Sequence, residues 1–368
     1  MAISTIDNNG VNLGQLGNRN LIINGAMQVA QRGTSVTGVT GNGYFICDRW
    51  YWDSNGSSAT NSLEQSSDAP DGFAYSFKAT ATTAFASPAS GDVRYLTYRF
   101  EGQDLQHLNF AKSTAKKVTV SFWVKTSVTG TAVLGIYQDD GALYYGKQYT
   151  VNAANTWEYK SVVVDLPTSG TVISNDNTSG LRIYFGLYSG TAYTSGSTET
   201  WGNITNWFVG QDNFSANTND TFQITGVQLE VGDTATPFEH RSYGEELARC
   251  QRYFWAQVPK GEANGAGGNA GQYIIGDGGF LGTGQIECHV QYPVQMRASP
   301  TLQPSSGTNH FLIEASSGID YFSNLVAFAQ KKQSSLLYNS GATSGTAGEY
   351  TRVAASSVNS YVYWDAEL

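Results

Sequence analysis

The sequence predicts an all-β protein in which an antiparallel sandwich of the jelly-roll type precedes a second, smaller C-terminal β-sandwich. Hydrophobic residues make up 40% of the 368 residues and aromatic residues 13%, more than a disordered chain carries. Charged residues make up 14%, against about 25% in an average soluble domain, and glycine occurs 41 times. Thr, Val, Tyr and Trp favour strands, and glycine favours tight turns. The length exceeds the roughly 250 to 300 residues at which one core usually stops growing, so we expect two domains.

Residues 1–19 are expected to form an N-terminal attachment arm. They are polar, rich in Gly and Asn, and without a periodic hydrophobic pattern, so they cannot fold alone. Such an arm is either disordered or ordered against another protein, for example as a strand added to a neighbour's sheet edge. Four apolar residues are the candidates for that contact: Ile3, Ile6, Val11 and Leu13.

Residues 20–240 show short strands at regular intervals. In the segment 118–124 every second residue is apolar, the two-residue period of a half-buried strand: Val118, Val120, Phe122 and Val124. Turn residues follow at 139–141 and 168–170. Because no helical period separates the strands, the pattern favours an antiparallel jelly roll over a parallel α/β sheet. Other strands are predicted at 93–100, 132–137, 143–151, 157–164, 181–188 and 222–229.

A short linking helix is predicted within residues 241–255. Ser242 and Glu245 form a capping box, which places the helix start before the run 246–254. Within that run one apolar stripe is formed by Leu247, Cys250 and Phe254. The stripe either packs on the chain's own domain or forms a seam where three chains meet at a trimer axis.

Residues 256–368 are predicted to form the second, distal β domain. The region 261–284 is rich in glycine, and small polar loops are expected at 305–309 and 340–348. Strands are predicted at 286–292, 311–314, 325–329 and 361–365.

The charge and the cysteines exclude several classes of partner. A formal net charge of −9 repels phosphate backbones and anionic lipid, so we expect no nucleic acid and no membrane insertion. No segment approaches the roughly 20 apolar residues of a membrane span, and the start lacks a secretory signal, so folding in a cytosol is expected.

The three cysteines lack paired spacing and are expected to be buried thiols: Cys47, Cys250 and Cys288. We expect no metal and no cofactor.

No motif for catalysis is present. The sequence GAGGNA at 265–270 follows no strand–turn–helix pattern and is interpreted as a flexible loop rather than a dinucleotide site. Glycoside hydrolysis needs only two acids about 5 to 9.5 Å apart, a separation that sequence does not reveal. The available acids are interpreted as turn and surface residues: Glu101 with Asp104, Asp139 with Asp140, and Glu158.

Aromatic residues in a Ser-, Thr- and Gly-rich stretch are better candidates for a function. Flat rings with polar tips are suited to stacking on sugar rings. The alternative is that Trp201 and Trp207 hold a long loop on the sandwich. The candidates for glycan binding are Tyr188, Tyr193, Trp201 and Trp207.

Several segments resemble a known module. They are NLIINGAM at 20–27, ITGVQLEVG at 224–232, ATPFE at 235–239 and EELARCQRYF at 245–254, with shorter matches at 32–33, 48–50 and 118–125. Over residues 20–255 the chain resembles tail fibre and related adhesion proteins of tailed bacteriophages. The segment 293–302 is similar, less specifically, to small distal domains of such proteins.

The resemblance implies a jelly-roll module like a carbohydrate-binding domain, a homotrimeric fibre and attachment to bacterial surface polysaccharide. It implies a virion location in the tail, with assembly in the host cytoplasm. Residues 1–19 would contact the tail or an adaptor protein, and residues 256–368 would face the host. We expect a structural protein rather than an enzyme. Two alternatives remain open: a head fibre or decoration protein, and a tailspike that depolymerises polysaccharide.

Overall fold

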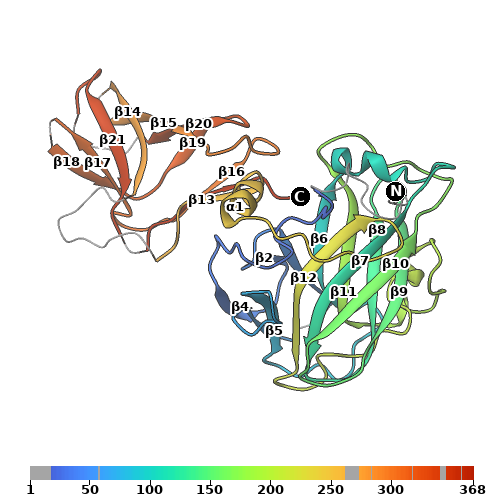
Figure 1. The fold of residues 1–368 in the computed structure, drawn as a ribbon. Coiled ribbons are helices and arrows are strands. Elements are labelled where there is room, and N and C mark those ends of the chain that lie inside the picture. The colour runs from blue at the N-terminus through green and yellow to red at the C-terminus, as the bar shows by residue number, and fades with distance from the viewer. Residues whose placement is uncertain are drawn as a thin grey trace, which may run out of the picture. The chain divides into compact units, whose positions relative to one another are not determined.

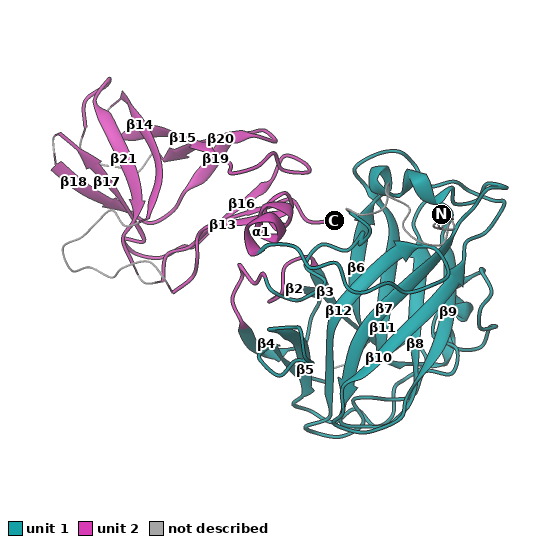
Figure 2. Cartoon of the chain, in the orientation of Figure 1, with its two compact units in different colours: residues 1–28, 35–44, 50–242 teal, residues 29–34, 45–49, 243–368 magenta. Residues whose placement is uncertain are grey.

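The computed structural model describes residues 18–56, 59–261, 273–282, 284–316, 318–339, 345–357 and 359–368. The chain divides into two units (Figure 2). Unit 1 contains residues 1–28, 35–44 and 50–242, and unit 2 contains residues 29–34, 45–49 and 243–368. The arm candidates Ile3, Ile6, Val11 and Leu13, and the glycine-rich segment 265–270, lie outside the described residues.

Unit 1 is an antiparallel jelly-roll sandwich of two six-stranded sheets, which confirms the predicted fold class. In the first sheet the long strands β12, β7 and β10 lie side by side (Figure 1). The first sheet has the order β1 (Ser35–Val39), β4 (Asn61–Ser66), β5 (Ser76–Ala81), β12 (Thr221–Val231), β7 (Lys117–Thr126), β10 (Glu158–Asp165). The second has the order β2 (Gly43–Tyr44), β3 (Trp50–Asn55), β6 (Val93–Glu101), β11 (Ser179–Ser189), β8 (Gly130–Gln138), β9 (Leu143–Val151). Short 3-10 helices lie in the connections: η2 (Gly102–Leu108), η3 (Thr191–Tyr193) and η4 (Ile204–Asn206).

The core of unit 1 follows the predicted alternation. Every second residue of β7 from Val118 to Val124 is fully buried, as the two-residue period predicts. Large rings from both sheets meet between them: the centroid of Phe185 on β11 lies 4.9 Å from Phe122 on β7 and 6.2 Å from Trp50 on β3. These contacts bury apolar area from both sheets, which is the main stabilising contribution to a sandwich.

The motif at 224–232 has a structural role. Gly226 has φ +62° at a bulge between Thr225 and Gln228, a conformation that side chains other than glycine rarely adopt. The Asn20 side chain donates to the Val227 carbonyl (3.1 Å) and accepts from the Leu229 amide (3.1 Å). Glu230 accepts from the backbone amide of Thr236 at 2.8 Å. The motif therefore holds the first and last described segments of unit 1 on the central strand β12.

Unit 2 contains one α-helix and two sheets that share a core. The helix α1 spans Tyr243–Gln251. The three-stranded sheet has the order β13 (Phe254–Val258), β22 (Val362–Asp365), β16 (Thr301–Pro304). The seven-stranded sheet has the order β18 (Gly318–Phe322), β17 (Phe311–Ala315), β21 (Tyr350–Ala355), β14 (Ile274–Gly282), β15 (Gln285–Gln291), β20 (Ser334–Asn339), β19 (Val326–Gln330). Buried residues of both sheets, including Trp364 and Phe311, belong to one hydrophobic cluster.

The helix differs from its sequence-based prediction. It ends at Gln251, and Phe254 begins strand β13. Cys250 and Phe254 are completely buried within unit 2, whereas Leu247 is half-buried. Side chains that are already buried in their own unit cannot line a seam between subunits, so Cys250 and Phe254 were wrong as seam candidates. A homotrimer stays a prediction.

Strand β14 lies within the glycine-rich region 261–284, where the composition did not predict a strand. Strand β14 pairs with β15 through Gly278 and Cys288 and with β21 through Gly278 and Thr351. A Cβ atom at Gly278 would collide with the carbonyl oxygen of Glu287. Glycine at this position therefore lets two backbones approach closely, which composition alone does not distinguish from a flexible loop.

A buried ionic cluster joins the two N-terminal segments of unit 2 to its C-terminal end. The Arg32 guanidinium lies 3.9 Å from Asp48 and 3.5 Å from Glu367, and Arg49 also pairs with Glu367. The Arg32 guanidinium stacks 3.4 Å above the ring centroid of Phe254. Because Glu367 lies more than 300 residues from Arg32 and Arg49, its two ion pairs fix the long-range topology of this unit.

Candidate functional site

The four aromatic candidates from the sequence lie in different environments. Tyr188 on β11 is completely buried, with its ring centroid 4.8 Å from that of Phe85. It has no ring face for a ligand and was wrong as a glycan-binding candidate. Trp207 is 6% exposed, while Tyr193 and Trp201 are half-buried.

Trp207 holds a long loop on the outward side of the second sheet. Its ring centroid lies 4.8 Å from that of Tyr184 and 5.1 Å from that of Tyr95. Gly135 and Gly146 face each other on β8 and β9, and a Cβ at Gly135 would lie 2.7 Å from Nε1 of Trp207. The two glycines thus leave the space that this loop fills, as the alternative interpretation of Trp207 expected.

Trp201 and Tyr193 also make contacts that stabilise the loop. The Trp201 indole Nε1 donates to the Asp165 carbonyl at 2.8 Å, and its ring meets the edge of Phe110 at 5.2 Å. The Tyr193 hydroxyl donates to the Gly91 carbonyl at 3.0 Å. The Tyr193 ring centroid also lies 5.7 Å from that of Trp207, so both side chains use their polar tip and their ring within the protein.

A different set of aromatic and charged residues shares the outward side of the second sheet. Strand pairing places Arg99 opposite Arg182, Arg182 opposite Tyr137, and Tyr137 opposite Tyr144. Side chains of directly paired residues lie on the same side of a sheet, so these four form a row across β6, β11, β8 and β9. We name as the outer face the half-buried residues Tyr44, Tyr51, Asp53, Arg99, Tyr137, Asp139, Tyr144 and Arg182.

Rings and guanidinium groups stack on one another along the outer face. The Arg99 guanidinium carbon lies 4.3 Å from the Tyr51 ring centroid, and that of Arg182 lies 5.3 Å from the Tyr137 centroid. The Tyr137 and Tyr144 centroids are 4.4 Å apart. Arginine presents several N–H donors in a fixed plane, and tyrosine presents both an apolar ring and a hydroxyl. The row therefore offers apolar faces and polar groups side by side.

Two carboxyl groups complete the outer face. Asp53 accepts a hydrogen bond from the Tyr95 hydroxyl at 2.8 Å, and Asp139 pairs with Arg182 and accepts from Ser179 at 2.9 Å. Burial raises the pKa of both carboxyl groups, while their hydrogen-bonding partners and the nearby arginines act in the opposite direction. Each acid thus has a defined structural partner.

The other acids considered from the sequence are engaged in structural contacts. Asp140 accepts from the Ser174 hydroxyl at 2.5 Å, and Glu101 accepts from the Gln103 side chain at 2.7 Å. Partial desolvation of Glu158 is outweighed by hydrogen bonds from Lys160 and nearby amides, which lower its pKa to about 2.

The three cysteines are free and buried, as predicted: Cys47, Cys250 and Cys288. Within the described ranges, no three His, Cys, Asp or Glu residues are grouped so that they could hold a metal, and no helix is long and apolar enough to cross a membrane.

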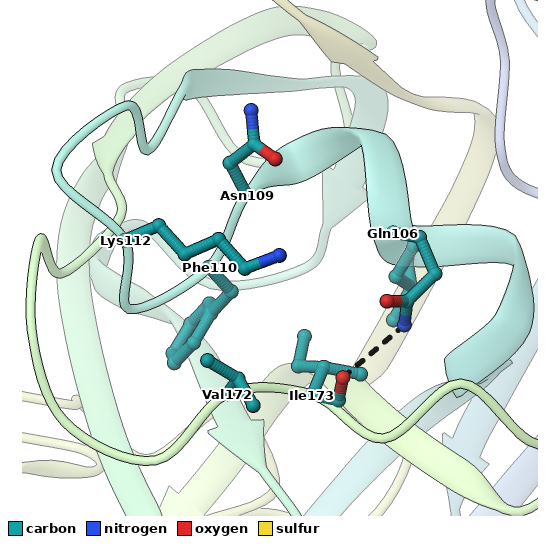
Figure 3. A pocket seen from close by; sticks show the side chains of 7 residues that line it. Gln106, Asn109, Phe110, Lys112, Val172 and Ile173 are labelled. Atoms are coloured by element: carbon teal, nitrogen blue, oxygen red, sulfur yellow. Dashed lines mark hydrogen bonds between the residues drawn. The ribbon is translucent and has the colours of Figure 1, made fainter.

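A small hollow lies beside the 3-10 helix η2 (Figure 3). Its lining includes Phe110 and Lys112, which lie together, and Gln106 and Ile173, which are joined by a hydrogen bond of 3.2 Å from Gln106 Nε2 to the Ile173 carbonyl. Its volume is about 10 Å³, which is the space of a single water molecule. It is too small for a sugar ring.

The outer face was missed from the sequence because its members have no common motif. They are spread from Tyr44 to Arg182 over six strands, with Asp139 just beyond the end of β8. The alternation of each strand predicts which residues point outward, but only the register between strands brings Arg99, Arg182 and Tyr137 into one row.

Comparisons with known proteins give partial likenesses. No protein-family model and no curated protein matches the chain. The enzymatically active domain of a tailspike protein from bacteriophage CBA120 is similar at 13% identity and a TM-score of 0.31, covering 58% of this chain and 22% of that one. A family 11 carbohydrate-binding module from Clostridium thermocellum, in complex with a mixed-linked tetrasaccharide, is 12% identical with a TM-score of 0.27, covering 56% and 98%. A xylan-binding domain from Paenibacillus barcinonensis is 12% identical with a TM-score of 0.26, covering 56% and 93%.

Proposed function

We propose that the chain is a structural, non-enzymatic subunit of a tailed-bacteriophage tail fibre, and that its jelly roll binds a glycan of the host cell surface through the outer face. The observation that carries the proposal is the row of arginine and tyrosine side chains at Arg99, Arg182, Tyr137 and Tyr144. The resemblance of residues 20–255 to phage adhesion proteins supports the setting in a virion.

The chemistry of the outer face suits reversible recognition of a saccharide. Tyr137 and Tyr144 offer ring surface to the C–H face of a sugar, and Arg99 and Arg182 offer donors to its hydroxyl oxygens. Asp53 and Asp139 accept hydrogen bonds from sugar hydroxyls. Such a face binds weakly as a single copy, and a homotrimer would raise the avidity through effective concentration without a new contact.

The direct test compares variants at two tyrosines, Tyr137 and Tyr159, in a titration with polysaccharide purified from the host envelope. Tyr137→Ala removes a ring from the outer face, whereas Tyr159→Ala removes a 45% exposed ring from β10 in the other sheet. We expect Tyr137→Ala to weaken binding at least tenfold, about 1.4 kcal/mol, and Tyr159→Ala to leave it unchanged. Tyr137→Phe, which keeps the ring, should retain most of the affinity. Equal binding by the wild type and Tyr137→Ala would refute the assignment of the outer face.

A tailspike that depolymerises polysaccharide remains a second candidate because of one observation. Asp53 and Asp139 lie on the same face, and burial raises the pKa of each, as in carboxyl groups that act as general acids. Incubation of the chain with host polysaccharide, followed by measurement of reducing ends, distinguishes the candidates. Release that disappears in Asp139→Asn would favour the enzyme, and no release favours a binding role.

Placement in the tail or the head is decided by where the N-terminus lies on the particle. We propose that residues 1–19 attach the chain to the tail or to an adaptor protein, with unit 2 toward the host. Gold labelling of the N-terminus followed by electron microscopy of intact particles tests this placement. Label on the head would instead favour a head fibre or decoration protein.

A further inference from the structure

A second candidate site lies on the seven-stranded sheet of unit 2. A hollow of about 300 Å³ is lined by Glu314, Ala315 and Ser316 at the end of β17 and by Tyr350 and Arg352 at the start of β21. Glu314 and Arg352 are direct partners across the two strands, so both side chains lie on the same side of the sheet. The volume reaches the lower end of the range of small-ligand pockets, roughly 300 Å³.

Tyr350 provides an exposed ring whose orientation is fixed. The residue is 61% exposed, and its hydroxyl donates to Asp277 Oδ1 at 2.7 Å. Its partner across the ladder on β14 is Gly279, so no side chain covers that flank of the ring. An exposed aromatic ring that is held at its polar tip loses little rotational freedom when a ligand stacks on it.

The polar groups around Tyr350 define which ligand fits. Arg352 lies 3.7 Å from Glu314 and 3.7 Å from Asp277. Glu349 accepts a hydrogen bond from the Ser316 hydroxyl at 2.7 Å. Two carboxyl groups thus flank one guanidinium group, and a third carboxyl group is bonded to Ser316 in the lining of the hollow. This excess of negative charge disfavours an acidic ligand.

We propose that this hollow is a second saccharide site, specific for a neutral or amino hexose over a uronic acid. The Tyr350 ring takes the apolar face of the sugar, and the carboxylates of Glu314 and Asp277 accept hydrogen bonds from its hydroxyl or ammonium groups. Arg352 donates to a ring or hydroxyl oxygen. This site goes beyond the glycan contact on unit 1 and does not depend on it.

The test uses the full chain labelled with 3-fluorotyrosine, so that each site reports separately. The Tyr350 and Tyr137 fluorine resonances are assigned with Tyr350→Phe and Tyr137→Phe, and the chain is titrated with D-glucose, D-glucosamine and D-glucuronate. We expect the Tyr350 resonance to shift with glucose and glucosamine and to respond at least tenfold more weakly to glucuronate. Sugar affinity at this site should fall at least tenfold in Glu314→Gln and remain unchanged in Tyr321→Ala, a 46% exposed tyrosine on β18 outside the hollow.

Three results would overturn the second site. One is a Tyr350 resonance that stays fixed with all three sugars, whatever happens at Tyr137. Another is an equal response to glucuronate, which would remove the charge argument. The third is a change of oligomeric state in Tyr350→Ala by light scattering, since it would mean that another copy of the chain covers the hollow. A Tyr137 resonance that stays fixed while Tyr350 shifts would count against the outer face alone.

Discussion

Replacing Asp48 with asparagine should change how the stability of unit 2 depends on pH. Asp48 is completely buried and accepts hydrogen bonds from the backbone amide (3.0 Å) and the side chain (2.5 Å) of Gln31. Burial raises the pKa of Asp48 to about 6, against the opposing effects of Arg32 and Gln31, and the charge of Glu367 adds to the rise. The carboxyl group therefore holds its proton in the folded chain at a pH where an unfolded chain has lost it.

The sign and size of the effect follow from this difference in pKa. An aspartate in an unfolded chain has a pKa of about 3.9. Between about pH 4 and pH 6 the folded state binds more protons than the unfolded state, so the contribution of Asp48 to the free energy of unfolding falls as pH rises. A difference of about two pKa units corresponds to about 3 kcal/mol, all of it lost by pH 7.

Calorimetric unfolding at several pH values between 4 and 7 measures this contribution. The free energy of unfolding of Asp48→Asn, minus that of the wild type, should rise by about 2 kcal/mol from pH 4 to pH 7, because part of the full difference is already lost at pH 4. Asp71→Asn, at an exposed aspartate of unit 1, is the matched control for the loss of one carboxyl group. A flat or falling difference for Asp48→Asn would mean that Arg32 and Gln31 stabilise the carboxylate by more than burial costs, and the reasoning would be refuted.

Three further predictions concern the loop held by Trp207, the glycine-rich strand β14 and the partly buried acid Glu158. Trp207→Ala should lower the free energy of unfolding of unit 1 by about 3 to 5 kcal/mol because it empties an aromatic cluster, and chemical denaturation measures this loss. Gly278→Val should prevent the pairing of β14 with β15, since its side chain collides with Glu287, and circular dichroism should show a reduced strand signal. Hydrogen bonds lower the pKa of Glu158 in the folded state only, so this group should make the wild type lose stability as pH falls from about 4.3 toward 2. Glu158→Gln should remove this loss. Equal dependence of the free energy of unfolding on pH in the two proteins would contradict the prediction.

The sequence predicted the long strands of the jelly roll well, because their pattern is local. In β7 apolar residues recur at every second position from Val118 to Val124, so the hydrophobic pattern itself indicates a strand. The strands β1 to β5 are short and partly polar, and β14 contains four glycines, so local pattern did not reveal them. Local propensity is informative only where it is strong, and tertiary contacts decide the rest.

The candidate site and the helix stripe depend on partners that are far apart in the sequence. Cys250 of α1 and Phe254 of β13 are buried, as an apolar stripe predicts, but the contacts around them come from distant residues. The Arg32 guanidinium stacks on the Phe254 ring, and the Gln31 side chain donates to the Phe254 carbonyl across 223 residues. Nothing in the spacing of Cys250 and Phe254 distinguishes such an internal partner from a second chain. The row at Arg99, Arg182 and Tyr137 has the same origin, because register between strands is a property of the folded sheet.

Unit 2 is built from two N-terminal segments and the C-terminal part of the chain, and this determines how a role in host contact is best tested. Deleting residues 256–368 removes β22, the partner of β13, and removes Glu367, the partner of both Arg32 and Arg49. The remaining chain would keep Arg32 and Arg49 but lose the Glu367 carboxylate with which both pair, and a buried pair that loses one member is strongly destabilising. Loss of adsorption in that truncation would therefore report misfolding as readily as a lost receptor contact. Point variants at exposed rings, Tyr350 in unit 2 and Tyr321 as its control, leave the ionic cluster intact and so isolate the contact itself.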